Sequence, residues 1–313
     1  MPGNDEFNDR SARFFALYER KDFAGALNVC DELEMAFPEQ RIHLIYWRMC
    51  IYSITGDMQA MMAAFQNALD QGMWWSQMML RNDPDFANIQ GNPEFERLVG
   101  KCAQMEQEAN QASQPERTVL KPVIDAQAHP IVFVLHGRLH LAIESADTWK
   151  AIQSLGWEVV LMQSSQLAFP GGYCWDDPDK TAREVRTHML EVTAGREAGI
   201  TEIILAGFSQ GASRALSLAY QLEVPVSGVI AVAPGRIALD DLIKIIDDHP
   251  ERKPKIVIMS GMQDRGHENH KGLVSALTVQ GVPCRLMTVE GMGHNYPDDF
   301  GTLFNDSIDF LGA

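Results

Sequence analysis

Residues 207–211 are Gly-Phe-Ser-Gln-Gly and follow a short apolar run at 203–206. A serine hydroxyl is a poor nucleophile, so an enzyme that uses one must expose it and place a base beside it. The G-x-S-x-G spacing is typical of a sharp turn from a strand into a helix, with the serine at the apex. A plain glycine-serine turn has the same letters, but the buried run before it and the helical spacing after it favour Ser209 as a nucleophile.

A carboxylate and a histidine follow Ser209 in the order that such a nucleophile requires. Asp264 comes after an apolar run at 256–259, and His294 follows a second predicted strand at 285–289. In an open parallel sheet, the loops after the carboxyl ends of the strands share one edge. We therefore expect Ser209, Asp264 and His294 to meet, with His294 as the base and Asp264 orienting it.

Other titratable groups compete for these roles. His267 and His270 are three residues apart, whereas the zinc motif H-E-x-x-H separates its histidines by four, so the sequence predicts no metal site. We place these two histidines on a solvated helix start. Asp298 and Asp299 lie too near His294 in sequence to reach its far ring nitrogen, and they are expected to cap a helix.

A glycine also follows the predicted strand at 131–135. Gly137 lets the backbone approach the reacting centre, and the backbone amides of Arg138 and Gln210 are the expected oxyanion donors. The Arg138 side chain has a separate possible use, such as binding an acidic group, and His136 is expected to brace the loop rather than act as a base. Tyr173 and Trp175 either line the pocket or only pack beneath a loop. The candidate substrate-binding residues are His136, Gly137, Tyr173, Trp175 and Met262.

The elements that would position these residues alternate between short buried runs and amphipathic helices. Such alternation predicts an α/β fold with a mostly parallel sheet and helices on both faces. The predicted strands lie near 131–136, 158–163, 202–207, 228–233, 255–260 and 284–289. The predicted helices lie near 144–155, 178–198, 210–221, 238–247, 268–280 and 301–311.

The first part of the chain has a different pattern and predicts an all-α domain over residues 1–112. Asp22 and Asp57 each separate two helical stretches and lie 35 residues apart, which suggests paired-helix repeats. This region resembles a tetratricopeptide pair over roughly residues 8–72, and a plain antiparallel helical array is the alternative. Polar residues then predict a linker at 113–117 and a second domain at 118–313.

Composition excludes several classes of function. The 313 residues carry a net charge of −16, so the sequence predicts neither a nucleic-acid platform nor an anionic-membrane surface. No apolar run approaches the ~18 residues needed to span a bilayer, and the first residues lack a signal pattern. Five widely spaced cysteines suit reduced thiols. We therefore expect a cytoplasmic protein.

Residues 135–137, residues 207–211, Asp264 and His294 occur in the order of the α/β-hydrolase superfamily, which residues 118–313 resemble. The Gly-Phe-Ser-Gln-Gly turn is similar to that of the phospholipase/carboxylesterase branch, which includes acyl-protein thioesterases. The resemblance implies hydrolysis of carboxylic esters or thioesters through an acyl-enzyme, with no metal or organic cofactor. Two features depart from this branch: its H-G-x-G-D loop is His-Gly-Arg-Leu-His here, and its minimal form has no helical region.

The sequence is compatible with two other functions. The helical region, as a repeat array, is a candidate for binding a protein partner, with the hydrolase domain serving as a scaffold. The same three catalytic groups also support a serine peptidase, since amide hydrolysis uses the same chemistry. The leading expectation is a serine hydrolase with a small-molecule ester or thioester substrate.

Overall fold

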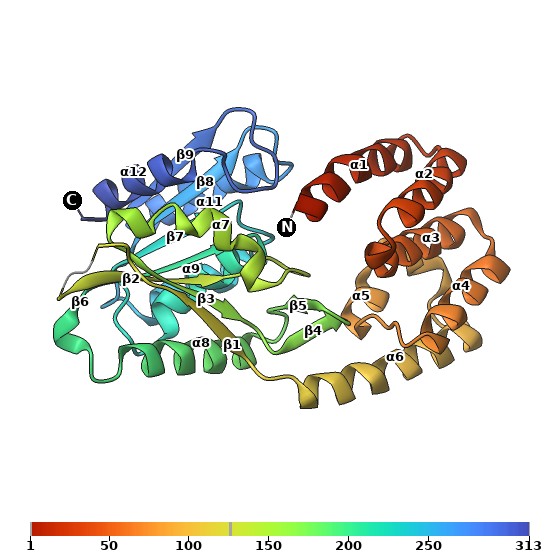
Figure 1. The fold of residues 1–313 in the computed structure, drawn as a ribbon, viewed down its shortest axis with the longest axis horizontal. Helices are drawn as coiled ribbons and strands as arrows, with labels where there is room; N and C mark the ends of the chain where they lie inside the picture. The colour runs from red at the N-terminus through yellow and green to blue at the C-terminus, as the bar shows by residue number, and fades with distance from the viewer. Residues whose placement is uncertain (1, 125–126, 313) are drawn as a thin grey trace. The chain divides into compact units, whose positions relative to one another are not determined.

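The computed structural model describes residues 2–124 and 127–312, so Met1 and Ala313, the outer ends of the two predicted domains, lie outside it. The chain divides into two compact units. The first comprises Met1–Ala112 and Leu167–Pro170, and the second comprises Ser113–Gln166 and Gly171–Ala313. The second unit contains the sheet, and the first is largely helical (Figure 1).

Within the described part of the second unit, seven strands form one sheet in the order β1-β3-β2-β6-β7-β8-β9 (Figure 1). Its strands are β1 (Glu116–Leu120), β2 (His129–Leu135), β3 (Glu158–Gln163), β6 (Ile200–Phe208), β7 (Gly228–Val232), β8 (Lys255–Gly261) and β9 (Cys284–Val289). The edge strand β1 runs antiparallel to β3, and the other neighbours pair in parallel. The carboxyl ends of these parallel strands therefore share one edge.

Helices cover both faces of this sheet because successive side chains of a strand point to opposite faces. In β6, Leu205 belongs to the core beneath α8, α9, α10 and α11, whereas Ile204 and Ala206 belong to the core beneath α7 and α12. The helices are α7 (Ala146–Lys150), α8 (Pro178–Thr193), α9 (Gln210–Gln221), α10 (Leu239–Asp248), α11 (His267–Val279) and α12 (Phe300–Gly312). The predicted α/β fold class is confirmed.

Several elements differ from the prediction. Strand β1 and a two-stranded hairpin, β4 (Gln166–Phe169) with β5 (Gly172–Cys174), were not expected. The predicted helix at 144–155 is instead three short pieces, 3-10 turns η3 (Ala142–Ser145) and η4 (Gln153–Leu155) on either side of α7. The chain leaves η4 at Gly156, whose φ of 85° suits a glycine. Helix α8 ends at Thr193, two residues before Gly195, which also has a positive φ of 71°.

The first unit begins with two helix pairs. In each pair the second helix starts at an aspartate of the same conformation: Asp22 has φ −82° and ψ 72°, and Asp57 has φ −79° and ψ 71°. Each carboxylate accepts a hydrogen bond from the backbone N–H three residues on, both at 3.0 Å. The pairs are α1 (Pro2–Glu19) with α2 (Phe23–Ala36), and α3 (Arg41–Thr55) with α4 (Met58–Asp70). The tetratricopeptide assignment itself stays a prediction.

The remainder of this unit consists of shorter helices and one long one. They are η1 (Pro38–Gln40), α5 (Gln77–Asn82), η2 (Pro84–Ile89) and α6 (Pro93–Ala112). The tip of the β4-β5 hairpin completes the unit: Leu167 N–H donates to Asn110 Oδ1 at 2.8 Å, and Ser76 N–H donates to Ala168 O at 2.7 Å. Residues 167–170 therefore pack with helices that precede them by more than fifty positions.

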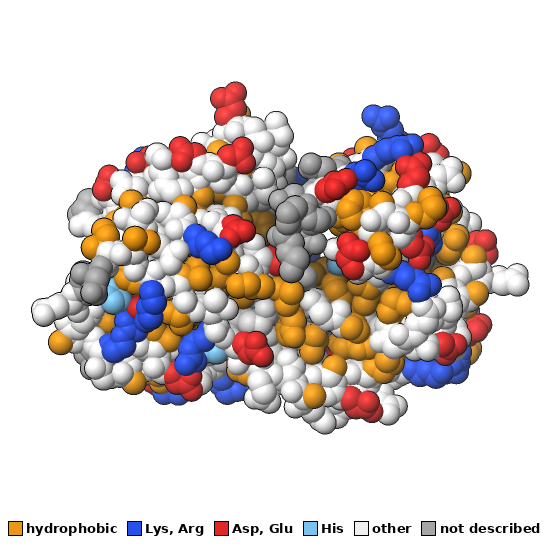
Figure 2. Space-filling model, viewed as in Figure 1, with side chains coloured by type: hydrophobic (Ala, Val, Ile, Leu, Met, Phe, Trp, Pro, Cys, Tyr) orange, Lys and Arg blue, Asp and Glu red, His pale blue; other side chains and the backbone are white. Residues whose placement is uncertain are grey.

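On the visible face of each unit, Lys and Arg side chains are intermixed with Asp and Glu (Figure 2). The described residues of this visible face therefore form no continuous positive patch. Among the described residues, no helix has both the length and the apolar character needed to cross a bilayer.

Replacing Asp57 by alanine removes the hydrogen bond to Ala60 N–H at the start of α4. We expect Asp57→Ala to lower the free energy of unfolding by about 1 kcal/mol, because one backbone donor loses its cap. Asp57→Asn is the matched control, since asparagine caps a helix about as well as aspartate. Urea unfolding followed by circular dichroism measures both variants, and equal stability of Asp57→Ala and wild type would contradict the capping role.

Candidate active site

Ser209 stands between β6 and α9 with φ 52° and ψ −117°. A non-glycine residue with positive φ is strained and keeps this conformation only where its surroundings hold it. Close backbone packing does so here. A Cβ on Gly207 would lie 2.4 Å from the carbonyl carbon of Gly211, and a Cβ on Gly211 would lie 2.3 Å from Leu135 O. A side chain at either position would clash with backbone atoms, so both glycines are needed for the turn to pack against the end of β2.

The structure brings together Ser209, His294 and Asp264. His294 Nε2 lies 2.9 Å from Ser209 Oγ, and His294 Nδ1 lies 2.8 Å from Asp264 Oδ2. Asp264 is buried, and its other oxygen accepts the Gly266 N–H at 2.7 Å. Because an ionised carboxylate only accepts, the Nδ1 atom of His294 carries the proton and Nε2 presents its lone pair to the serine. This arrangement suits a base that receives the hydroxyl proton.

The loops that carry Asp264 and His294 are packed on one another. A Cβ on Gly261, at the end of β8, would lie 2.1 Å from Met292 O. Gln263 N–H donates to the same Met292 carbonyl at 3.0 Å, and Met262 N–H donates to Val289 O at 2.9 Å. These backbone contacts fix the distance between Asp264 and His294, which lie 30 residues apart in the sequence.

His267 and His270 are buried, so the prediction of a solvated helix start is wrong. Their Nδ1 atoms lie 2.8 and 2.7 Å from the hydroxyl oxygen of Ser260, and His270 Nε2 lies 2.8 Å from Pro234 O. His270 Nε2–H must donate to that carbonyl, so its Nδ1 accepts the Ser260 hydroxyl, which in turn accepts His267 Nδ1–H. Burial lowers the pKa of His270. Their spacing with Leu273 was the signal for a buried helix face.

These histidines also tie β8 to the turn that supports the serine. The carbonyl that His270 binds belongs to Pro234, directly after Ala233, whose N–H donates to Met259 O at 2.8 Å. The next residue, Gly235, donates its N–H to Ser209 O at 2.9 Å. His267 and His270 therefore act as buried polar connectors rather than metal ligands.

The loop after β2 lies against the residue that precedes the serine. A Cβ on Gly137 would lie 2.8 Å from the Phe208 ring. His136 is buried, its Nδ1–H donates to Gly137 O at 2.7 Å, and its Nε2 accepts the Ser164 N–H at 3.2 Å. Burial lowers the pKa of His136 to about 4, so the ring is neutral. This geometry matches the expected bracing role and leaves His136 almost no surface for a substrate.

The other candidate pocket residues differ in exposure. Trp175 is fully buried and donates its indole N–H to His136 O at 3.0 Å, so it packs beneath the loop, the second of the two roles considered for it. Tyr173 is half-buried, and its carbonyl accepts the Leu139 N–H at 2.6 Å. Met262 is 58% exposed. Of the candidates, Tyr173 and Met262 keep side-chain surface that a substrate can reach.

Asp176 is a residue of this region that the sequence did not indicate. Its carboxylate accepts Arg138 Nη2–H at 2.9 Å and Gln210 Nε2–H at 2.6 Å. Burial acts to raise the pKa of Asp176, but these hydrogen bonds and the charge of Arg138 outweigh it and hold the pKa below its usual value. The expectation that the Arg138 side chain binds an acidic group is met by a residue 38 positions away, and no local pattern marks that partner.

Asp298 and Asp299, the rivals of Asp264, lie exposed just before α12. The carbonyl oxygen of Asp299 accepts Leu303 N–H at 3.2 Å, which is the backbone bond of a residue at a helix start. Their position agrees with the expected place at the beginning of a helix.

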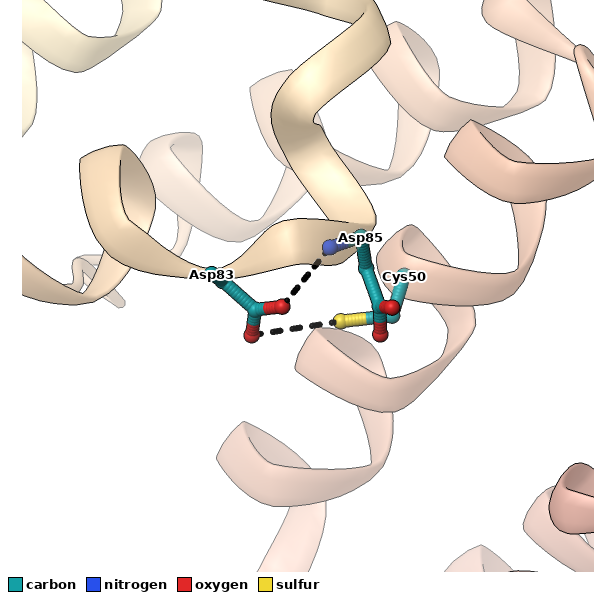
Figure 3. Close-up of side chains that lie close together, drawn as sticks. All are labelled: Cys50, Asp83 and Asp85. Atoms are coloured by element: carbon teal, nitrogen blue, oxygen red, sulfur yellow. Dashed lines mark hydrogen bonds between the residues drawn. The ribbon is translucent and has the colours of Figure 1, made fainter.

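A cluster of potential ligands for a cation lies in the first unit (Figure 3). The ligand atoms of Cys50, Asp83 and Asp85 lie within 4.8 Å of one another. Protein donors already bind the carboxylates: Tyr46 OH donates to Asp83 at 2.8 Å, and Tyr18 OH donates to Asp85 at 2.5 Å. Burial raises the pKa of Cys50, which keeps the thiol protonated, whereas a metal needs the thiolate. The cluster is a hydrogen-bonded start to η2, where Asp83 also caps Asp85 N–H.

Comparisons with known proteins agree with this fold. Residues 11–110 match the family model described as the A/B hydrolase-like N-terminal domain. An uncharacterized protein from Bacillus cereus ATCC 10987 is similar over 97% of this chain and 99% of its own, with 21% identity and a TM-score of 0.55. Esterase PE8 covers 63% of this chain and 99% of its own, with 20% identity and a TM-score of 0.52.

Acyl-protein thioesterase 2 from Zea mays is similar over 63% of this chain and 99% of its own, with 16% identity and a TM-score of 0.51. None of the curated proteins compared with the chain matches it. Similarity at these identities shows a shared fold. The sheet and these similar structures show that residues of the second unit have an α/β-hydrolase-type fold.

The buried, neutral His136 makes stability depend on pH. Its folded pKa, about 4, lies below the ordinary 6.5, so the unfolded chain binds more protons between these values. This contribution to stability is complete above pH 6.5 and is lost as the pH falls toward 4, by at most about 1.4 kcal/mol per pH unit. We expect His136→Gln to be less stable than wild type at pH 7 but to lose less stability on acidification.

Urea unfolding of both proteins at pH 7, 5.5 and 4.5 measures this difference. His249→Gln is a suitable control, because His249 lies near the surface at the end of α10. Parallel pH dependences of wild type and His136→Gln would show that His136 is protonated as readily in the folded as in the unfolded chain.

Proposed function

We propose that this protein is a serine hydrolase that cleaves carboxylic esters or thioesters through an acyl-enzyme. The observation that carries the proposal is the continuous hydrogen-bonded chain from buried Asp264 through His294 to Ser209, at 2.8 and 2.9 Å. It meets the strained turn that presents the serine, at the carboxyl edge of a parallel sheet. Nucleophile, base and orienting acid are thus within hydrogen-bonding distance of one another.

The first half of the reaction forms the acyl-enzyme. Ser209 Oγ attacks the carbonyl carbon while its proton passes to His294 Nε2, and the carbonyl oxygen becomes an oxyanion. The backbone N–H groups of Arg138 and Gln210 are the proposed donors to that oxyanion. Gln210 is the first residue of α9, so its N–H has no acceptor within the helix. Collapse of the intermediate breaks the bond to the alcohol or thiol, which takes the proton from His294.

The second half returns the free enzyme. A water molecule gives its proton to His294 Nε2 as its oxygen attacks the acyl carbon, and collapse of this intermediate releases the carboxylic acid and restores the Ser209 hydroxyl. In both halves His294 becomes a cation, and the carboxylate of Asp264 at 2.8 Å stabilises it. The proton that His294 Nε2 receives therefore comes from serine or water and passes to the leaving group or back to Ser209.

Proteins of similar fold support ester and thioester substrates, rather than peptides, for this chain. Two of the similar structures are named as an esterase and an acyl-protein thioesterase. An alcohol or thiol also departs more readily than an amine, so the proposed chemistry demands less of His294 as an acid. A peptidase remains the alternative, and substrate comparison decides between them.

Replacing Ser209 by alanine removes the proposed nucleophile, the Ser209 hydroxyl. We expect Ser209→Ala to abolish hydrolysis of p-nitrophenyl acetate and labelling by a fluorophosphonate probe, because no acyl-enzyme can form. Ser217→Ala is the matched control, because Ser217 lies about two turns further along the same helix and its hydroxyl donates to the Arg214 carbonyl at 3.0 Å. Matched ester, thioester and amide substrates measured with the same proteins give the leaving-group class. Undiminished turnover by Ser209→Ala would overturn the proposal.

Asp264→Asn tests which carboxylate orients the base. An asparagine at 264 fails to stabilise the His294 cation and favours the wrong tautomer, so kcat should fall by about 10⁴ in a Ser-His-Asp enzyme. Asp298→Asn is the control, since Asp298 is an exposed aspartate only four residues from His294. Steady-state kinetics measure both. A large loss in Asp298→Asn, with little change in Asp264→Asn, would give the acid role to the loop before α12.

A further inference from the structure

We propose that Asp176 is a positioning residue that sets the geometry of the oxyanion hole, an inference that rests on the proposed function. The two proposed oxyanion donors, the amides of Arg138 and Gln210, belong to segments 72 residues apart in the sequence. One carboxylate binds the side chains of both. Asp176 therefore fixes the separation of two backbone donors without contacting the substrate itself.

The contacts of Asp176 are short and largely removed from solvent. Arg138 approaches with two nitrogens, Nη2 at 2.9 Å from Oδ2 and Nε at 3.2 Å from Oδ1. Gln210 Nε2 lies 2.6 Å from Oδ1. The side chain of Asp176 is only 14% exposed. A two-pronged arginine contact restricts orientation as well as distance, so this carboxylate specifies where both side chains lie.

The same segment of chain, residues 173–176, holds the loop that carries Arg138. Leu139 N–H donates to Tyr173 O at 2.6 Å, and the Trp175 indole donates to His136 O at 3.0 Å. Leu139 has a φ of 69°, so the loop turns through a conformation that a leucine rarely adopts. Residues on both sides of Arg138 are thus fixed from segment 173–176, and Asp176 adds the third attachment.

Segment 173–176 also holds the start of α9. Trp175 N–H donates to Gln210 Oε1 at 2.9 Å, so the Gln210 amide group is bound at its oxygen by Trp175 and at its nitrogen by Asp176. One turn further on, Arg214 donates to the carbonyls of Trp175 at 2.8 Å and Asp176 at 3.1 Å. The segment therefore connects the two parts of the proposed hole.

Catalysis is sensitive to this spacing. Oxyanion donors must lie about 2.7–3.1 Å from the place where the charge develops, and each is worth on the order of 10²–10³ in kcat. Two donors on separate segments keep that spacing only if something fixes the segments together. Arg138 also offsets the negative charge of Asp176, so the carboxylate can lie near the hole with less repulsion of the oxyanion.

The neighbouring aspartate has a different task and supplies the control. Asp177 is exposed and caps α8, where its carboxylate accepts the Lys180 N–H at 2.9 Å. Among the described residues, its carboxylate bonds at the start of α8 and not to Arg138 or Gln210. Substitutions at these two adjacent aspartates therefore distinguish a loss of helix stability from a loss of oxyanion geometry.

The test compares Asp176→Asn with Asp177→Ala in the full chain. Asparagine replaces one of the two accepting oxygens with an NH2 group that faces an N–H of Arg138 or Gln210 and so breaks the shared contact. We expect kcat on p-nitrophenyl acetate to fall roughly ten- to a hundredfold, with KM within about twofold. Asp177→Ala should lower the melting temperature and leave kcat unchanged. The inhibition constant of a trifluoromethyl ketone, which forms an oxyanion with the serine, should rise in Asp176→Asn by the same factor as kcat/KM falls.

Gln210→Ala is the second variant, because it removes one contact of Asp176 but keeps the backbone amide. Its kcat should fall several-fold, and the double variant should lose less than the product of the two single losses, since both act on one contact. If Asp176→Asn fails to fold, Gln210→Ala still tests the positioning role. Unchanged kcat in both single variants, or a rise in KM alone, would overturn the positioning role.

The outcome also separates this inference from the proposed function. If Ser209→Ala retains turnover, the serine mechanism itself is wrong, and the positioning role falls with it. If Ser209→Ala is inactive while Asp176→Asn keeps the kcat of Asp177→Ala, the serine mechanism stands and only the role of Asp176 is refuted.

Discussion

The site depends on one backbone contact, that between Gly211 in the first turn of α9 and the end of β2. Any side chain at Gly211 would meet Leu135 O and His136 O within 2.5 Å. This approach brings the start of α9, with Gln210, to the loop that begins at His136. The positive φ of Ser209 is the geometric cost of that approach, since the chain must reverse within one residue. The position of the proposed nucleophile and the proximity of the proposed oxyanion donors therefore have the same cause.

Two buried carboxylates at opposite edges of the sheet have different partners and therefore different roles. Glu158, at the amino end of β3, is fully buried and binds Arg196, Lys121 and His129. Their hydrogen bonds outweigh burial and lower the pKa of Glu158 to about 2. These partners neutralise the buried charge of Glu158, so it serves the fold. Asp264, at the carboxyl edge, has a histidine partner whose other nitrogen faces Ser209, and its charge can therefore act on a reaction.

Sequence reasoning succeeded where the signal was local. The buried parallel strands have continuous apolar runs, and the serine turn is specified by glycines two residues to either side. It failed where contacts with other elements set a residue's environment. His267 and His270 are buried because both bind the Ser260 hydroxyl at the end of β8, and His270 also binds the Pro234 carbonyl, 36 residues away. Asp176 gave no signal because its partners are 34 and 38 residues away.

Short elements were missed for another reason. Strand β1 has polar and half-buried residues, Glu-Arg-Thr-Val-Leu, because it is an edge strand with only β3 as a neighbour, so it lacks the apolar run of a central strand. The hairpin β4-β5 did carry a turn signal, the Pro-Gly-Gly at 170–172, with Gly171 at a φ of 83°. Its strands, of four and three residues, are too short to show a period of two.

The hairpin also shows why the boundary between the two units does not correspond to one cut in the sequence. Residues 167–170 belong to the first unit, where Ala168 and Phe169 are buried and Asn110 binds the Leu167 N–H. Three residues later, segment 173–176 holds the loop of the proposed oxyanion donor Arg138 and the start of α9. A chain shortened to begin after residue 112 would lose the hydrogen-bond partners of 167–170 and expose the ring of Phe169. Its effect on activity would then report on the hairpin as well as on the helices.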